Sequence, residues 1–120
     1  MPKQVTIYHN PKCGTSRNAL ALLREKGIEP VVIEYLKQPP TRSELKALLE
    51  MLRIPVRDLL RTKEKEYSAL GLDAPKVTEG QILEAISEHP ILLQRPIVVV
   101  DERAAICRPV ERVGELIAGP

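Results

Sequence analysis

Hydrophobic and polar positions follow two periods along this chain, and the changes between them divide it into segments. A β-branched run at residues 5–8 predicts a first strand. After a loop, alanines and leucines at helical spacing predict a helix that ends at Gly27, and residues 30–36 predict a second strand. Because a helix separates these strands, we expect them to form a parallel, right-handed βαβ unit.

The middle of the chain has helical patterns only. Thr41 and Glu44 have the spacing of a capping box, and leucines follow at helical intervals until Pro55 ends the pattern. Short helices are predicted at 56–61 and at about 64–70. Thr78 then opens another capped helix, whose apolar face carries Ile82, Leu83 and Ile86.

The last third returns to β structure. Residues 97–100 form the strongest β pattern, and after a turn at 101–103 the segment 104–107 is expected to pair with them as an antiparallel strand. Pro109 is predicted to begin a final amphipathic helix that ends at Gly119. The order of elements predicts an α/β fold: a thioredoxin-like, glutaredoxin-like mixed four-stranded sheet with flanking helices and a helical insertion at about 41–90.

The length and the charge narrow the classes of function. A chain of 120 residues has the size of one domain, so we expect a single domain over residues 1–120. A formal charge of +2, from 18 basic and 16 acidic residues, gives no strong field for nucleic acid or membranes. The chain has no Phe or Trp to stack bases, and its apolar runs are too short to span a bilayer. We therefore expect neither nucleic acid nor membrane as a partner.

The two cysteines are too few for a disulfide scaffold, and no secretory signal pattern opens the sequence. The reducing cytosol is therefore the expected compartment, and the protein is expected to be cytoplasmic. The cysteines and the two histidines have no recognisable metal-ligand spacing, so no metal site is predicted.

Cys13 is the candidate nucleophile, because it lies just before the first predicted helix. Unpaired N–H groups and the positive end of the helix dipole favour the thiolate there. The alternative is a small buried apolar residue. Loop-forming and polar neighbours such as Asn10, Pro11 and Gly14 favour the functional interpretation, and Thr15 and Ser16 offer N-cap side chains.

The same loop excludes two familiar cysteine sites. A dithiol redox site needs a second cysteine at position 16, which is Ser16, so the C-x-x-C motif is absent. A cysteine phosphatase loop needs an arginine six residues after the nucleophile, where this chain has Ala19. The motif therefore has a single thiol, Cys13, and its arginine is Arg17, four residues further along the chain.

Arginines are the candidate anion ligands. Arg95 precedes the predicted β-hairpin and Arg108 follows it, so both are expected to project from one end of the hairpin toward the Cys13 loop. Arg61 is less distinctive, because Arg57 of the same predicted helix has a similar setting. A solvated role is the default for other arginines such as Arg24.

Polar neighbours of Cys13 have two interpretations each. His9 either lowers the cysteine pKa as an imidazolium or orients the loop by hydrogen bonding. Asn10, Ser16 and Arg17 are candidate donors to the thiolate or to an anion. The alternative role of Ser16 is to cap the first predicted helix. Outside the loop, Cys107 is expected to be a packed strand residue. His89 is expected to have a structural role at a helix end.

The loop from His9 to Asn18 resembles the glutaredoxin-linked arsenate reductase family. The resemblance covers the chain from Val5 to about Ile117. Further matching blocks are Leu59-Leu60-Arg61, His89-Pro90-Ile91-Leu92, Arg95-Pro96-Ile97-Val98-Val99 and Cys107-Arg108-Pro109. The resemblance implies that Cys13 attacks arsenate, that Arg61, Arg95 and Arg108 hold the oxyanion, and that Pro96 is a cis proline facing the cysteine loop.

The resemblance also implies the reductants. In such a reaction the Cys13 thiolate forms a cysteinyl arsenate, glutathione joins the arsenic, and glutaredoxin removes glutathione as a mixed disulfide. The arsenite adduct then hydrolyses. Glutathione is a co-substrate, no bound cofactor is expected, and the protein is expected to be a monomer.

Two other functions share the predicted fold. Spx-type transcriptional regulators act by binding RNA polymerase, but they typically carry C-x-x-C, against which Ser16 argues. A monothiol glutaredoxin typically has Thr-Val-Pro where this chain has Gln94-Arg95-Pro96. A positive charge at that point favours an oxyanion.

Overall fold

The computed structural model describes residues 4–118, and these divide into two compact units. The first unit is formed by the chain up to Gln38 and again from Arg95 onward, and the second by Pro39–Gln94. The predicted insertion at 41–90 corresponds to this second unit. A single domain over residues 1–120 stays a prediction.

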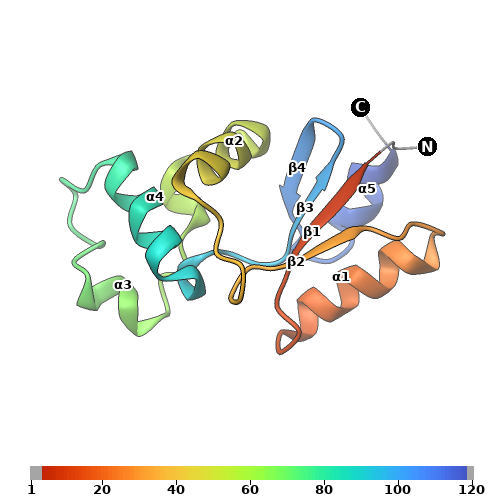
Figure 1. Cartoon of the computed structure of the whole chain (residues 1–120), viewed down its shortest axis with the longest axis horizontal. Coiled ribbons are helices and arrows are strands. Elements are labelled where there is room, and N and C mark those ends of the chain that lie inside the picture. Colours follow the sequence, from red (N-terminus) through yellow and green to blue (C-terminus); the bar gives the residue numbers. More distant parts are fainter. Residues whose placement is uncertain (1–3, 119–120) are drawn as a thin grey trace. The chain divides into compact units, whose positions relative to one another are not determined.

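The first unit contains the sheet (Figure 1), in the order β2-β1-β3-β4. Its strands are β1 Val5–His9, β2 Val31–Glu34, β3 Ile97–Val100 and β4 Arg103–Ile106. Strand β1 pairs parallel with β2 and antiparallel with β3, and β3 pairs antiparallel with β4. The predicted βαβ unit, the mixed four-stranded sheet and the thioredoxin-like plan are confirmed. Strand β2 is shorter than the predicted segment 30–36. Strand β4 begins and ends one residue earlier than the predicted segment 104–107.

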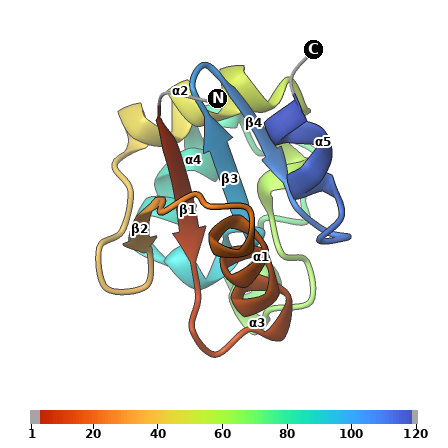
Figure 2. The same cartoon turned by 90° about the vertical axis from the view of Figure 1, so that its right-hand side faces the viewer.

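Helices α1 Gly14–Glu25 and α5 Arg112–Ala118 cover one face of this sheet (Figure 2). Their apolar residues pack on the central strands in a core that contains Ile7, Ala19, Leu23, Val98 and Val113. Burial of these aliphatic side chains is the main stabilising term for the unit. Helix α1 ends as predicted, because Gly27 has a φ of 81°, which a side chain would disfavour.

The start of α5 differs from the prediction. Pro109 precedes the helix instead of beginning it, and its peptide bond with Arg108 is cis. The first helical residue is Arg112, after a turn in which Arg112 N–H donates to the Pro109 carbonyl at 3.2 Å. The predicted end at Gly119 lies outside the described residues.

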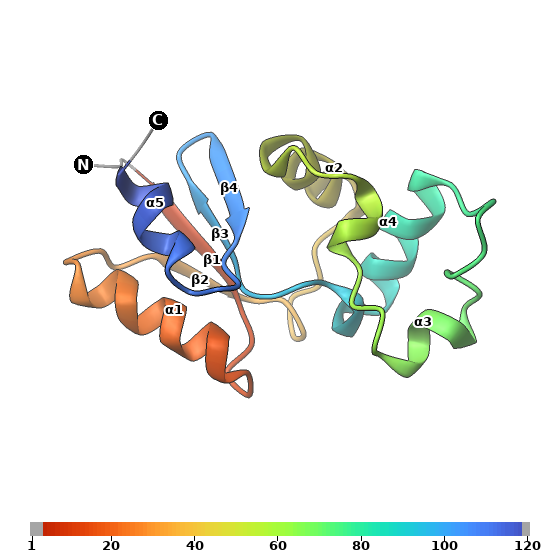
Figure 3. The same cartoon turned by 180° about the vertical axis from the view of Figure 1, so that it is seen from behind.

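The second unit is helical (Figure 3). It contains α2 Arg42–Leu52, α3 Lys65–Ala69 and α4 Glu79–Glu88, with 3-10 helices η1 Val56–Leu59 and η2 Pro90–Leu92. Both predicted capping boxes are present: Thr41 Oγ1 accepts from Glu44 N–H and Thr78 Oγ1 accepts from Gln81 N–H, and in each case the later side chain accepts from the backbone N–H of the threonine.

The core of this unit is aliphatic. Helices α2 and α4 lie side by side, and their buried faces consist of Leu45, Leu48, Leu49, Leu52, Ile82, Leu83 and Ile86. Leu60 and Leu93 form an isolated antiparallel bridge, and the Gln94 side-chain amide donates to the Leu60 carbonyl at 2.9 Å. These bonds tie the end of η1 to the segment that leaves the unit.

Candidate functional site

The Cys13 thiol lies at the N-terminus of α1. Cys13 is the N-cap residue, with an extended backbone (φ −95°, ψ 122°). Its N–H donates to the Asn10 carbonyl, and its carbonyl accepts from Arg17 N–H, both at 3.0 Å. The first N–H groups of a helix have no partner within the helix, so those of Thr15 and Ser16 are directed at the sulfur.

These surroundings lower the pKa of Cys13. Partial burial of the thiol raises the pKa, but the backbone N–H of Ser16, the guanidinium of Arg95 and the N–H of Thr15 together outweigh it. The thiolate is therefore stabilised at a lower pH than for a free cysteine. A lowered pKa and partial exposure are the two properties that a cysteine nucleophile needs.

Arg95 is next to Cys13 and has unused hydrogen-bonding capacity. Its guanidinium hydrogen-bonds to the thiol and also acts on it through its charge. Within residues 4–118, Arg95 Nε and Nη1 are buried and have no hydrogen-bond partner. A buried donor without a partner is costly, by about 1–3 kcal/mol or more for a charged group, so the site strongly favours an anion beside the thiol.

Ser16 is not the helix cap that the sequence offered. The N-cap position is Cys13, and neither Thr15 nor Ser16 makes a side-chain cap bond. Ser16 Oγ is buried and instead accepts from Asn10 N–H at 3.0 Å and bonds His9 Nδ1 at 2.6 Å. The Ser16 hydroxyl therefore bonds to the chain at the end of β1 and fixes the loop on which Cys13 lies.

His9 is placed to orient this loop. Burial lowers the pKa of its imidazole, with opposing effects from Glu34, which raises it, and from Arg24 and Arg17, which lower it. A neutral imidazole bonded to Ser16 fits the interpretation in which His9 orients the loop by hydrogen bonding.

The other loop side chains bond to the loop itself. Asn10 Oδ1 accepts from Lys12 N–H at 3.0 Å, and Arg17 Nη1 donates to the Pro11 carbonyl at 2.8 Å. Neither side chain donates to the thiol in this arrangement. Both rigidify the turn before Cys13, which keeps the sulfur aligned with the helix N–H groups.

Arg108 lies on the same side of the hairpin as Arg95. Its exposed side chain donates from Nη1 to the Arg95 carbonyl at 3.3 Å. Cys107 N–H donates to the Pro96 carbonyl at 2.9 Å, so the strand end that carries Arg108 is fixed to the segment after Arg95. The Arg95–Pro96 peptide bond is cis, as the resemblance implied. The first unit thus contains Cys13, Arg95, Pro96 and Arg108.

Cys107 is packed in the core as predicted, but it lies one residue after the end of β4 and not within the strand. It is fully buried in the core of the first unit, and burial raises its pKa to about 11. Its Sγ donates to the Ala105 carbonyl at 3.7 Å. A protonated, inaccessible thiol is a poor nucleophile.

Arg61 lies in the second unit and is half-buried. Its Nη2 pairs with Glu64 Oε2 at 3.3 Å, whereas its Nη1 is buried and has no hydrogen-bond partner within residues 4–118. Its N–H donates to the Leu92 carbonyl at 2.8 Å. Arg61 therefore resembles Arg95 in holding a buried nitrogen that is free to bind an anion.

The ambiguity between Arg57 and Arg61 is removed by their partners. Arg57 Nη1 and Nη2 donate to the carbonyls of Leu72 and Ala74 at 3.0 and 2.7 Å. Its guanidinium has a structural role, which leaves Arg61 as the anion-binding candidate of this segment.

Some features of the site had only weak sequence signals. Glu64 was not singled out, although its spacing of three residues from Arg61 is one that brings side chains together. The unpartnered nitrogens of Arg61 and Arg95 depend on tertiary packing. In the described part of the chain, no group of three or more metal-ligating side chains is present, and no helix has the length and apolarity to cross a membrane.

The chain is similar to known proteins in sequence and in fold. The model of the ArsC family matches residues 8–116. The chain is 49% identical over 113 residues to an arsenate reductase of Rhizobium meliloti (strain 1021), covering 94% of this chain and 81% of that protein. It is 48% identical to an arsenate reductase of Escherichia coli (strain K12), over 94% and 80% of the two chains. The solved structure of an arsenate reductase from Vibrio cholerae has a TM-score of 0.93 and 44% identity, over 96% and 98% of the chains.

Proposed function

This chain belongs to the ArsC family, and on that basis we propose that it is an arsenate reductase that converts arsenate to arsenite. The observation that carries the proposal is the pairing of an activated thiol with a free cationic donor. Cys13 has a lowered pKa, and Arg95 beside it holds two buried nitrogens without a hydrogen-bond partner among the described residues.

The first step is attack of the Cys13 thiolate on arsenic(V). A sulfur–arsenic bond forms and an arsenate oxygen leaves as water or hydroxide. Nucleophile and substrate are both anionic, so their repulsion must be offset by fixed positive charge. Arg95 supplies that charge next to the sulfur, and its planar donors suit a tetrahedral oxyanion.

Arg108 belongs to the same proposed anion site, since it is tied to Arg95 through the Arg95 carbonyl. The family resemblance assigns the same role to Arg61, and Arg61 holds a buried nitrogen without a hydrogen-bond partner among the described residues. Guanidinium groups balance the charge of arsenate and of the cysteinyl arsenate that follows. His9, Asn10, Ser16 and Arg17 hold the loop, and Pro96 shapes the backbone beside Arg95.

The reductants proposed are glutathione and glutaredoxin, without a bound cofactor. Glutathione joins the arsenic through a second sulfur–arsenic bond, with loss of water. A glutaredoxin thiolate then attacks the glutathione sulfur, and the electron pair of the broken bond reduces arsenic(V) to arsenic(III). Water finally hydrolyses the Cys13–arsenic bond, which releases arsenite.

An external thiol is favoured because the chain offers no suitable internal one. Its only other cysteine is Cys107, which is fully buried and has a pKa raised to about 11. The cytoplasm, which is rich in reduced glutathione, is the proposed compartment. We propose a monomer as the working form.

A coupled assay tests this function. Arsenite release should require arsenate, glutathione and glutaredoxin together, and phosphate in place of arsenate should give no turnover. Arsenite formed equally without glutaredoxin would contradict the proposed reductants. No arsenite under any combination, with folded protein, would contradict arsenate reduction itself, and binding of RNA polymerase by the same preparation would then favour the Spx-type alternative.

A further inference from the structure

Gln94 is hydrogen-bonded twice to the segment that leads to Arg61, and the proposed function gives Gln94 no role. Its backbone N–H donates to the Leu59 carbonyl at 2.8 Å, and its side-chain amide donates to the Leu60 carbonyl at 2.9 Å. Gln94 is the last residue of the second unit, so both contacts lie within that unit. Backbone and side chain of one residue thus hold the chain just before Arg61.

The backbone bonds form a short antiparallel ladder around the bridge between Leu60 and Leu93. Arg61 N–H donates to the Leu92 carbonyl at 2.8 Å, and Gln94 N–H donates on the other side of the bridge. In this pattern, the two bridged residues point their own N–H and C=O groups away from each other's segment. The ladder itself therefore provides no partner for the Leu60 carbonyl.

The Leu60 carbonyl depends on the Gln94 side chain for its hydrogen bond. Leu60 is 2% exposed, and the great majority of buried carbonyls in native structures are hydrogen-bonded. The peptide group between residues 60 and 61 is planar, with its C=O and N–H on opposite sides. Gln94 Nε2 holds the C=O and the Leu92 carbonyl holds the N–H, so this peptide group is fixed from both sides.

The orientation of this peptide group matters because the Arg61 side chain extends from it. Arg61 Nη2 pairs with Glu64 Oε2 at 3.3 Å, and both side chains are mostly buried. Arg61 Nη1 is buried and has no hydrogen-bond partner within residues 4–118. A rotation of the backbone at Arg61 would break the pair with Glu64 or turn Nη1 away from its present direction, and a small misplacement of such a group weakens its action on a substrate.

We propose that Gln94 is a positioning residue for Arg61 in the reduction of arsenate and that it acts through the Leu60 carbonyl. This inference rests on the proposed function and on the role that Arg61 has in it. Gln94 does not contact the substrate in this role. Its amide fixes the backbone from which the anion-binding guanidinium extends.

Steady-state kinetics in the coupled arsenate assay test this role. Gln94→Ala removes the donor, and Gln94→Glu replaces it with a carboxylate of nearly the same shape that cannot donate when ionised. Each variant is expected to raise KM for arsenate about three- to fivefold with little change in kcat, because a misdirected guanidinium weakens substrate binding. An unchanged KM in both variants would overturn the proposal.

Two further measurements distinguish an effect on Arg61 from an effect on Arg95, the residue that follows Gln94. The Gln94→Ala/Arg61→Ala variant should have the same kcat/KM as Arg61→Ala alone, because the side chain that Gln94 positions is then absent. The pH midpoint of Cys13 alkylation should be unchanged in Gln94→Ala, because Arg95 and the helix N–H groups set it. Multiplied losses in the double variant, or a raised midpoint in Gln94→Ala, would contradict the proposal.

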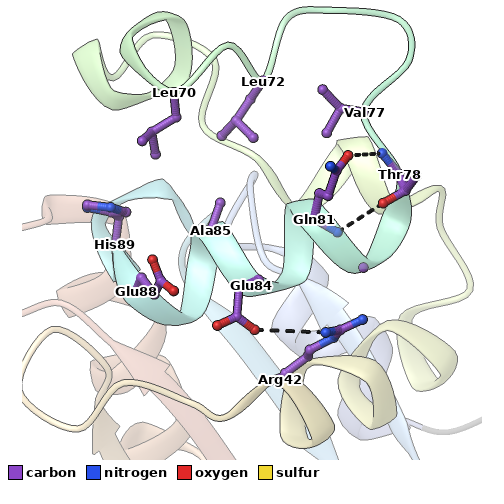
Figure 4. A pocket seen from close by; sticks show the side chains of 11 residues that line it. Arg42, Leu70, Leu72, Val77, Thr78, Gln81, Glu84, Ala85, Glu88 and His89 are labelled. Carbon is purple, nitrogen blue, oxygen red and sulfur yellow. Dashed lines mark hydrogen bonds and ion pairs between the residues drawn. The ribbon is translucent and has the colours of Figure 1, made fainter.

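Gln81→Ala is the matched control for lost stability. Gln81 is a glutamine of the same unit, and its Oε1 accepts from Thr78 N–H at 2.9 Å in the capping box of α4 (Figure 4). Its substitution should lower the free energy of unfolding without a change in KM for arsenate. If Gln81→Ala raised KM as much as Gln94→Ala does, the effect would come from lost stability and the proposal would fail.

Hydrogen exchange of the Arg61 amide is a readout that does not depend on activity. Gln94→Ala should accelerate this exchange about fivefold, because the peptide group is then held on one side only, and Gln81→Ala should leave it unchanged. Unchanged exchange in Gln94→Ala would overturn the positioning role. If the unmodified chain released no arsenite, the proposed function would fail, and faster exchange in Gln94→Ala would still show that Gln94 holds this segment.

Discussion

Arg95 acts on Cys13 in two ways: by hydrogen bonding to the thiol and through its charge, both of which lower the pKa of the cysteine. Two further nitrogens of the same guanidinium, Nε and Nη1, are buried without a hydrogen-bond partner in the described part of the chain. One side chain thus activates the nucleophile and still offers donors to an incoming oxyanion.

The two cysteines should differ completely in their contribution to turnover. Cys13→Ser is expected to abolish arsenate reduction, because only this thiol lies at a helix N-terminus and beside Arg95. Cys107→Ala should keep most of kcat and lose about 1 kcal/mol of stability at a fully buried position. Equal loss of activity in both variants would indicate an internal disulfide and exclude the glutathione scheme.

The reactivity of Cys13 should have a pH midpoint below that of a free cysteine, about 8.5. Alkylation rates measured against pH in the Cys107→Ala background report the thiolate fraction of Cys13 alone. Arg95→Ala should move the midpoint upward, because removal of the positive charge disfavours the thiolate. An unmoved midpoint in that variant would show that the helix N–H groups act without Arg95.

Cys107 should make the fold less stable at alkaline pH. Burial raises its pKa to about 11 in the folded chain, so the unfolded chain loses the proton first as pH rises. The contribution of the thiol to stability is therefore complete below about pH 8.5 and is lost toward pH 11, by an amount on the order of 3 kcal/mol. Urea unfolding at pH 8 and pH 10.5 measures this loss, which should be smaller in Cys107→Ala.

Arg95, Arg108 and Arg61 should each contribute to arsenate reduction. Alanine at any of these positions is expected to lower kcat/KM by about 10- to 150-fold, which corresponds to one charged hydrogen bond of roughly 1.5–3 kcal/mol. Lysine at 95 or 108 should restore only part of this loss, because it lacks the planar fork. Arg24→Ala is the control, since Arg24 is exposed and pairs with Glu29. If kcat/KM for arsenate were unchanged in all three alanine variants, these arginines would not be the residues that bind the anion.

Glu64 should position Arg61 for the substrate. The two side chains pair at 3.3 Å and are only 18% and 25% exposed, so the ion pair restricts the guanidinium. Glu64→Ala is expected to raise KM for arsenate about three- to tenfold with little change in kcat, and the Arg61→Ala/Glu64→Ala variant should match Arg61→Ala alone. Additive losses in the double variant would show that Glu64 acts independently of Arg61. Glu50→Ala, at an exposed position of α2, serves as the control.

Local patterns predicted most of the elements from the sequence. The capping boxes at Thr41 and Thr78 and the left-handed Gly27 depend on bonds or backbone angles within four residues, which the chain encodes directly. Runs of β-branched residues predicted the four strands together with the turns and helices that separate them, because such side chains favour extended backbone and must be buried. The position of Cys13 before α1 also follows from such local rules.

Choices between competing partners depended on tertiary structure. The sequence offers Ser16 as a helix cap, but its hydroxyl bonds to Asn10 and His9, six and seven residues away. Arg57 and Arg61 look alike in the sequence, and only the carbonyls of Leu72 and Ala74 distinguish them. Sequence spacing carries little information on bonds over such separations, because the free energy that selects them comes from packing of distant segments. The same reason explains why the buried, unpartnered nitrogens of Arg61 and Arg95 could be identified only in the folded chain.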